Sequence, residues 1–253
     1  MWPISYRSPA MARVRLDTLL ADRGLFGSRS RAAASVMAGE VLVGAERRRI
    51  DKPGQMVEAD VVVSVDAAPD YVSRGGTKLA NALDALGVPV EGRFGLDVGA
   101  STGGFTDVLL QRGAAQVIAL DVAYGELHWK LRTDDRVTVM ERTNARSLTP
   151  EDLPYAPDLI VADVSFISLT KVLPAVLACG ADGFDCLAMV KPQFEVGRDR
   201  VGKGVVHDPA LRREAIDGVA EAARALGCRV RGEAESGLPG PKGNLETFLW
   251  LSA

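Results

Sequence analysis

The sequence is poor in the residues that bind metal ions or form disulfides. Its 253 residues include two histidines, His128 and His207, and three cysteines, Cys179, Cys186 and Cys228. No two cysteines form a C-x-x-C pair, and the histidines lie far apart in the chain. A zinc site or a disulfide framework is therefore not expected, and no metal is predicted.

Long apolar runs are also absent. No run reaches the about 18 to 20 residues that cross a bilayer. The opening MWPISYRSPAM has neither a basic stretch followed by an apolar core nor a cleavage site. We therefore expect a cytoplasmic protein with reduced thiols. Residues 1–12 are expected to be a disordered extension, with Met11 as an alternative start to Met1.

The sequence has no overall excess of positive charge, since 30 Lys and Arg face 33 Asp and Glu. The two ends nevertheless differ. Residues 1–52 hold ten basic and five acidic side chains, which leaves 20 basic and 28 acidic ones for the other 201 residues. A function that binds a polyanion is therefore expected near the N-terminus.

Residues 13–66 have the helix and strand signals of a small α+β domain. Leucines at helical spacing precede Arg23-Gly24, where a first helix should end, and a second helix is expected over 29–37. Short β-branched segments at 41–43 and 61–65 predict strands. About 50 residues form only a small core. The following segment AAPDYVSRGG, residues 67–76, is typical of an interdomain linker.

Strand and helix signals alternate from residue 77 to residue 253, which predicts an α/β domain with a parallel sheet. A helix is expected over 210–226, after the cap Asp208-Pro209. The last two expected strands, 229–234 and 246–251, flank the loop GLPGPKGN and should form an antiparallel edge. The other expected segments are strands at 94–98, 116–122, 159–162 and 186–190, and helices at 105–111 and 169–178.

A glycine-rich turn follows the first of these strands, in the segment LDVGASTGGF. Small residues there let a ligand approach the backbone and the N-terminus of the next helix. The spacing departs from G-x-G-x-x-G and lacks G-K-[ST], which excludes a P-loop. A carboxylate at Asp97 favours a cofactor with a cationic group, such as S-adenosylmethionine, and Asp121 can accept from ribose hydroxyls. The structural alternative is a simple tight turn with Asp121 as a solvated strand end.

Two more strands end in charged residues. Asp163 follows LIVA, and Lys191 follows LAMV. Ligands bind at the carboxyl ends of the strands in open α/β sheets, so these side chains should converge with Asp97 and Asp121 on one rim.

Long ordered blocks between residues 13 and 251 resemble the TlyA family of ribosomal RNA 2′-O-methyltransferases, historically called haemolysins. The blocks are SRGGTKL, LDVGASTGGFTDVLLQRGA, ERTNAR, VADVSFISL, VKPQFEVG, GVVHDP and LPGPKGNLETFLWL. This resemblance implies an S4-like RNA-binding domain at 13–66, joined to an FtsJ-like, class I (Rossmann-like) S-adenosylmethionine-dependent methyltransferase domain at 77–253.

The resemblance also implies specific site residues. The Lys-Asp-Lys-Glu tetrad of FtsJ-like ribose methyltransferases falls on Lys78, Asp163, Lys191 and Glu246. Together with the residues above, it implies that the glycine-rich turn surrounds the methionine part of the cofactor, that Asp121 binds its ribose and that Asn144 and Ala145 lie against its adenine. The expected cofactor contacts are Asp97, Gly99, Ala100, Ser101, Thr102, Gly103, Gly104, Phe105, Asp121, Asn144, Ala145 and Asp163.

A ribose 2′-hydroxyl is a poor nucleophile at neutral pH, so its attack on a methyl group needs a side chain that orients it and takes its proton. We expect Lys191 to act as base or orienter, with Asp163 orienting Lys191 and with Lys78 and Glu246 positioning the substrate. The sequence leaves open which lysine takes the proton. Phe166 and Phe194 are either stacking partners of a flipped cytidine or core aromatics.

The S4-like resemblance implies phosphate contacts in the basic N-terminal region, and the alternative for each residue is a solvated charged surface. The expected RNA-binding residues are Arg15, Arg29, Arg31, Arg47, Arg48, Arg49 and Lys52, with Arg74 coupling the two domains. The leading hypothesis is 2′-O-methylation of cytidine in ribosomal RNA of the large subunit, with the small subunit as a second candidate. The sequence ends two residues after LETFLWL, whereas some family members carry a further C-terminal helix, and this departure argues against activity on both subunits. The alternatives are a non-catalytic ribosome-assembly factor and a membrane-lytic haemolysin.

Overall fold

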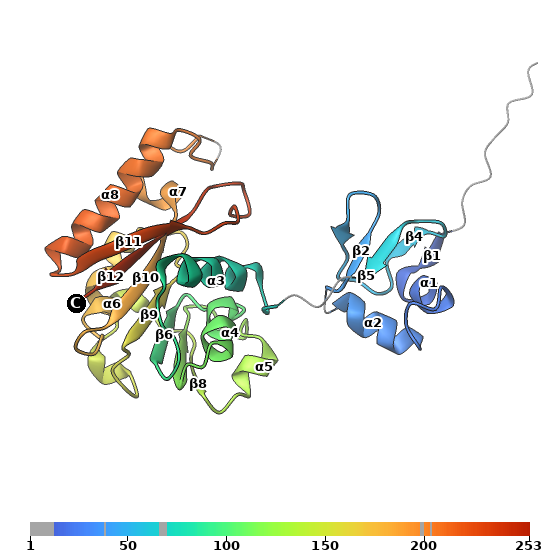
Figure 1. The fold of residues 1–253 in the computed structure, drawn as a ribbon, viewed down its shortest axis with the longest axis horizontal. Helices are drawn as coiled ribbons and strands as arrows, with labels where there is room; N and C mark the ends of the chain where they lie inside the picture. The colour runs from blue at the N-terminus through green and yellow to red at the C-terminus, as the bar shows by residue number, and fades with distance from the viewer. Residues whose placement is uncertain (1–12, 38, 66–69, 198–199, 203) are drawn as a thin grey trace, which may run out of the picture. The chain divides into compact units, whose positions relative to one another are not determined.

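The computed structural model describes residues 13–37, 39–65, 70–197, 200–202 and 204–253 (Figure 1). The chain divides into two compact units between Asp70 and Tyr71. The expected extension over 1–12 and the middle of the expected linker, 66–69, lie outside the described residues.

The N-terminal unit is built from two helices and short strands. α1 (Leu16–Asp22) and α2 (Arg29–Met37) lie where leucine spacing and the alanine-rich segment predict them. Leu16, Leu20 and Val36 are fully buried between these helices and the strands. β3 (Arg48–Arg49), β2 (Val41–Val43) and β5 (Val63–Val65) form one small sheet, and β1 (Arg13–Arg15) pairs with β4 (Met56–Glu58). Segments of two or three residues carry too little periodicity to be predicted, which is why β1, β3 and β4 were not expected.

The second unit contains a seven-stranded sheet with the order β11-β12-β10-β9-β6-β7-β8. The α/β fold class is thereby confirmed. The parallel strands are β6 (Phe94–Val98), β7 (Gln116–Leu120), β8 (Val137–Met140), β9 (Leu159–Ala162) and β10 (Asp185–Val190). β12 (Thr247–Ser252) runs antiparallel to β10, and β11 (Arg229–Glu235) runs antiparallel to β12, as the closing hairpin predicts. β8 is a further strand, beyond those expected from the sequence.

Helices cover both faces of this sheet (Figure 1). Alternate residues of β9 show the two layers, since Ile160 and Ala162 belong to one apolar core and Leu159 and Val161 to the other. The first core includes residues of α6 (Leu173–Leu177) and α8 (Pro209–Ala225), and the second includes α3 (Arg74–Leu86), α4 (Gly104–Gln111) and Leu131 of α5 (Trp129–Arg132). Short turns complete the unit: α7 (Pro192–Glu195) and the 3₁₀ turns η1 (Ala145–Ser147), η2 (Pro150–Asp152) and η3 (Leu169–Lys171).

Helix α3 begins inside the segment that composition assigns to the linker. Its first residue is Arg74, and Gly75 and Gly76 form part of its first turn. A Cβ on Gly76 would lie 3.0 Å from the carbonyl oxygen of Gly104, the first residue of α4. Gly76 therefore allows close packing of α3 on α4, and both glycines belong to a helix instead of a flexible connection.

Candidate active site

The glycine-rich turn connects β6 to α4 at the carboxyl end of the sheet. Gly99 has a φ of +85°, and a Cβ there would lie 2.5 Å from the carbonyl oxygen of Asp163. Only glycine fits this approach, because any side chain would collide with the backbone that follows β9. Gly103, at φ +93°, caps α4 in the left-handed conformation. The turn thus lies directly beside the end of β9, where Asp163 emerges.

Asp97 supports this turn from beneath. Its side chain is fully buried, and Oδ2 accepts hydrogen bonds from the backbone N–H (2.9 Å) and the hydroxyl (2.7 Å) of Thr106. Burial raises the pKa of Asp97 to about 7, against the opposing effect of the Thr106 hydrogen bonds. Asp97 and Gly103 are the two expected cofactor residues that line none of the cavities at this edge.

A cavity of about 540 Å³ opens above the ends of β6, β7 and β9. The Asp121 carboxylate in its wall accepts backbone N–H groups from Ser101 (2.7 Å) and Ala123 (2.8 Å). Because each oxygen takes one bond, lone pairs remain for two neighbouring hydroxyl groups. Of the expected cofactor residues, the cavity is lined by Gly99, Ser101, Asp121, Asn144, Ala145 and Asp163.

An adjoining cavity of about 290 Å³ brings the four predicted tetrad residues together. Lys78 extends from α3, Asp163 and Lys191 follow β9 and β10, and Glu246 precedes β12. The same cavity is lined by the other residues of the glycine-rich turn that were expected to contact the cofactor, and by Arg74. The lining includes Arg74, Lys78, Ala100, Thr102, Gly104, Phe105, Asp163, Lys191 and Glu246.

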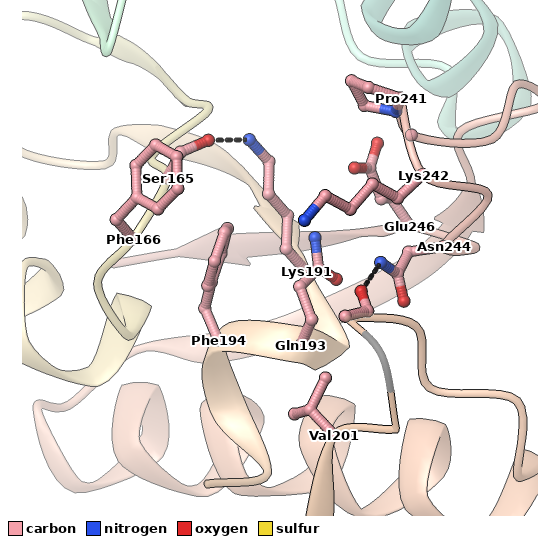
Figure 2. A pocket seen from close by; sticks show the side chains of 12 residues that line it. Ser165, Phe166, Lys191, Gln193, Phe194, Val201, Pro241, Lys242, Asn244 and Glu246 are labelled. Carbon is pink, nitrogen blue, oxygen red and sulfur yellow. Dashed lines mark hydrogen bonds between the residues drawn. The ribbon is translucent and has the colours of Figure 1, made fainter. Parts of the chain in front are cut away.

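The tetrad is organised as two ion pairs. The Lys78 ammonium pairs with the Glu246 carboxylate, and both side chains are buried. The Lys191 ammonium pairs with Asp163 and also donates to the Ser165 hydroxyl at 2.7 Å (Figure 2). Each ammonium group is therefore fixed in position by a carboxylate before any substrate arrives.

A third cavity of about 520 Å³ shares Ser165, Lys191, Pro241 and Glu246 with the second. Figure 2 shows Phe166 and Phe194 on one side of it, with ring centroids 5.5 Å apart. Phe166 is 91% exposed and has a φ of +66°. The interpretation of Phe166 as a core aromatic is therefore wrong, and its ring is free to contact a ligand.

Several residues of this region were not identified from the sequence. Ser165 was within reach, because it lies two residues after Asp163 in the VADVSF block. Gln193 and Lys242 also line the third cavity, but they occur in a short turn and in a Gly/Pro-rich loop that show no periodic signal. Tyr124 and Arg142 are sequence neighbours of the lining residues Ala123 and Thr143, and they stack with the guanidinium carbon 4.2 Å from the ring centroid.

The basic residues predicted for RNA binding fall into two groups. Arg15 and Arg29 pair with the buried carboxylate of Asp17, at 2.7 Å and 3.3 Å. The Arg15 hydrogen bond holds the pKa of Asp17 well below its usual range, so these two arginines stabilise the fold of the N-terminal unit. Arg49 donates to the carbonyl of Gly39. All three arginines are nevertheless exposed as residues, and so are Arg31, Arg47, Arg48 and Lys52.

The residues that the structure describes contain no group of three His, Cys, Asp or Glu side chains placed to hold a metal ion. None of the described helices is both long and apolar enough to span a membrane.

Comparison with known proteins places the second unit among methyltransferases. Residues 71–253 match the FtsJ-like methyltransferase family. A Mycobacterium tuberculosis protein named 16S/23S rRNA (cytidine-2′-O)-methyltransferase TlyA is 51% identical over 247 residues, which cover 94% of this chain and 90% of that protein. A Streptococcus thermophilus structure provisionally named a hemolysin is 42% identical, covers 96% of this chain and 89% of its own, and has a TM-score of 0.74. Aeropyrum pernix fibrillarin with bound S-adenosyl-L-methionine shares the fold at 19% identity, with a TM-score of 0.50 over 70% of this chain and 76% of its own.

Proposed function

The chain belongs to the TlyA family of FtsJ-like methyltransferases, and we propose that it transfers a methyl group from S-adenosylmethionine to the ribose 2′-hydroxyl of a cytidine in ribosomal RNA. The large subunit is the first candidate substrate and the small subunit the second. The observation that carries the proposal is the convergence of Lys78, Asp163, Lys191 and Glu246 beside the cavity over the glycine-rich turn.

The residues around the first cavity suit S-adenosylmethionine. Gly99 has no side chain, so a ligand can reach the backbone of the turn. The Asp121 carboxylate keeps lone pairs for the two hydroxyls of a ribose. Asn144 and Ala145, at the start of η1, line the part of the cavity assigned to the adenine. When bound, the cofactor supplies an electrophilic methyl group on a positively charged sulfur.

Lys191 is the residue assigned to the attacking hydroxyl. Its ammonium is held by Asp163 and Ser165 at the rim that the second and third cavities share. To act as base, Lys191 must first release its ammonium proton. From this rim the neutral amine Nζ can then accept a hydrogen bond from the 2′-hydroxyl, orient it toward the methyl group and take its proton as the new carbon–oxygen bond forms and the carbon–sulfur bond of the cofactor breaks. Ser165 and Asp163 act through Lys191, since they fix the direction in which its ammonium points.

Lys78 and Glu246 are assigned to positioning. Their ion pair joins the first turns of α3 to the start of β12, so it holds together two walls of the second cavity. Arg74, exposed at the start of α3, also lines this cavity and can contact a phosphate next to the target ribose. The four tetrad residues then hold one nucleotide in a single orientation relative to the bound cofactor.

The N-terminal unit is assigned to RNA capture as an S4-like domain. The exposed side chains of Arg31, Arg47, Arg48 and Lys52 lie in a region with a net positive charge, whereas the rest of the chain is acidic. Such an asymmetry favours binding to a polyanion through that unit. The exposed Phe166, with Phe194 beside it, is assigned to stacking on the flipped base.

The test is methyl transfer from tritiated S-adenosylmethionine to large and small ribosomal subunits that lack the modification, each assayed separately. Label in the RNA of the large subunit is expected, and label in the small subunit would establish the second substrate. Cofactor binding without label on either particle would favour the ribosome-assembly factor instead.

A further inference from the structure

Gln193 carries a buried hydrogen-bond acceptor that the protein does not use. It lies in α7, two residues after Lys191, and lines the third cavity (Figure 2). Its Oε1 atom is buried and has no hydrogen-bond partner among the residues that the structure describes. Burying an unpaired acceptor lowers stability, so buried acceptors are normally paired. Because Gln193 lines a cavity, its amide can turn toward that space and accept from a donor on a ligand.

The other buried polar groups of this wall are already engaged. Asn244 accepts from the backbone N–H of Val206 and donates to the carbonyl of Gly204, both at 2.9 Å. Glu246 pairs with Lys78. Asn244 and Glu246 are therefore occupied within the fold, and the Ser165 hydroxyl accepts from Lys191, whereas the Gln193 amide oxygen has no partner among the described residues.

The shape and place of the cavity suit a nucleobase. Phe166, Phe194, Val201 and Pro241 give it apolar surfaces, which favour a planar ring. The cavity opens on Lys191, so a ribose whose 2′-hydroxyl meets Nζ of Lys191 would direct its base toward these surfaces.

An amide side chain presents an acceptor and a donor side by side. Cytosine presents the complementary pair on its Watson–Crick edge, with the exocyclic N4 amine as donor and N3 as acceptor. Resting on the proposed function, we infer that Gln193 recognises the target cytosine, with Oε1 accepting from the N4 amine and Nε2 donating to N3. If the amide rotated by 180°, its donor and acceptor would exchange places and match O4 and N3–H of uracil. The test must therefore change the N4 amine, which only cytosine has of these two bases.

The test combines a change in the protein with a change in the base. Gln193→Ala removes the amide, and an RNA with 4-deaminocytidine at the methylated position removes only the N4 amine. We expect the wild-type protein to lose at least about tenfold in kcat/KM when the amine is removed. Gln193→Ala should lose a similar factor on cytidine RNA and show no further loss on the 4-deamino RNA.

Gln193→Glu keeps an acceptor at this position, so it should stay sensitive to removal of the amine even if Gln193→Ala folds poorly. The exposed Gln116→Ala is the matched control and should behave as wild type. The affinity for S-adenosylmethionine should not change in any of the variants. If the losses from Gln193→Ala and from the missing amine multiply, Gln193 does not bind the amine and the inference is overturned while the proposed function stands. If the wild-type protein methylates no cytidine RNA, the proposed function itself fails and the inference fails with it.

Discussion

Lys78 and Glu246 are 168 residues apart in the sequence, yet their side chains form an ion pair with both partners buried. The pair joins α3, at the start of the second unit, to β12, at its end. Lys191 and Asp163 form the second pair of the site, from adjacent parallel strands. The candidate active site is therefore assembled only when the whole sheet has formed.

The buried Lys78–Glu246 pair should be important for stability as well as for activity. Glu246→Ala leaves the Lys78 ammonium buried without a partner, and should lower the free energy of unfolding by about 3–5 kcal/mol. The double variant Lys78→Met/Glu246→Leu removes both charges and should recover most of that loss in urea unfolding. It should still lack methyl transfer. A double variant with wild-type activity would show that the pair is structural alone.

Gly99 should be required because of its contact with the backbone at Asp163. Gly99→Ala and Gly183→Ala both put a side chain at a positive φ, but a Cβ at Gly183 meets nothing within 4 Å. Gly183→Ala should therefore lower the free energy of unfolding by only about 1 kcal/mol, which is the cost of placing alanine at a positive φ. Gly99→Ala should cost more in thermal unfolding and should also weaken S-adenosylmethionine binding in titration calorimetry. Equal effects of the two variants would show that the Asp163 contact is unimportant.

Asp97 should make stability depend on pH. Burial raises its pKa from 3.8 to about 7 in the folded protein. Between these values the folded protein keeps a proton that the unfolded chain has released, so this group's contribution to stability falls as the pH rises from about 4 to about 7. Asp97→Asn cannot ionise and keeps an oxygen that can accept from Thr106.

Urea unfolding of wild type and Asp97→Asn at pH 5 and pH 8 checks this directly. The variant should gain stability relative to wild type at pH 8 compared with pH 5. The exposed Asp182→Asn serves as the control and should show no such gain. An Asp97→Asn difference that is the same at both pH values would contradict the raised pKa.

RNA binding should depend on the exposed arginines of the N-terminal unit. Arg31 and Arg48 suit the test better than Arg15 or Arg29, because the latter two pair with Asp17 and their loss would disturb the fold. Arg31→Glu/Arg48→Glu should weaken RNA binding and reduce the slope of log affinity against log salt by about 1 for each lost phosphate contact. The affinity for S-adenosylmethionine should be unchanged.

Filter binding at several salt concentrations and calorimetry with the cofactor measure the two affinities. The double variant Arg224→Glu/Arg229→Glu replaces two exposed arginines of the second unit and is the matched control for net charge. Equal loss of RNA and cofactor affinity in the double variant would refute the division of labour between the two units.

Part of the site could be predicted from local patterns because its residues follow buried strands, whereas Lys78 and Glu246 were expected only from the family resemblance. The apolar strands before Asp163 and Lys191 and the glycine-rich turn after Asp97 are local signals, and each places its charged residue at the carboxyl end of the sheet. The order of elements in the α/β unit and its antiparallel edge followed from similar local patterns.

The remaining features depend on contacts between distant segments. Gly75 and Gly76 have the composition of a linker, but they belong to α3 because α4 packs against them. Asp97 is expected at the cofactor, but its bonds to Thr106 hold it beneath the turn. Arg15 and Arg29 differ from the other basic residues only through the buried Asp17, which no local pattern indicates.

The central claim, that a ribose 2′-hydroxyl is methylated with the help of Lys191, is tested most directly by identifying the labelled nucleoside. Ribosomal RNA incubated with the protein and S-adenosylmethionine is digested to nucleosides and analysed by mass spectrometry, with Lys191→Ala and the exposed Lys171→Ala in parallel. We predict 2′-O-methylcytidine from wild type and Lys171→Ala, and a loss of about 100-fold or more in its rate of formation with Lys191→Ala. A methyl group on the base, or undiminished 2′-O-methylcytidine from Lys191→Ala, would contradict the account.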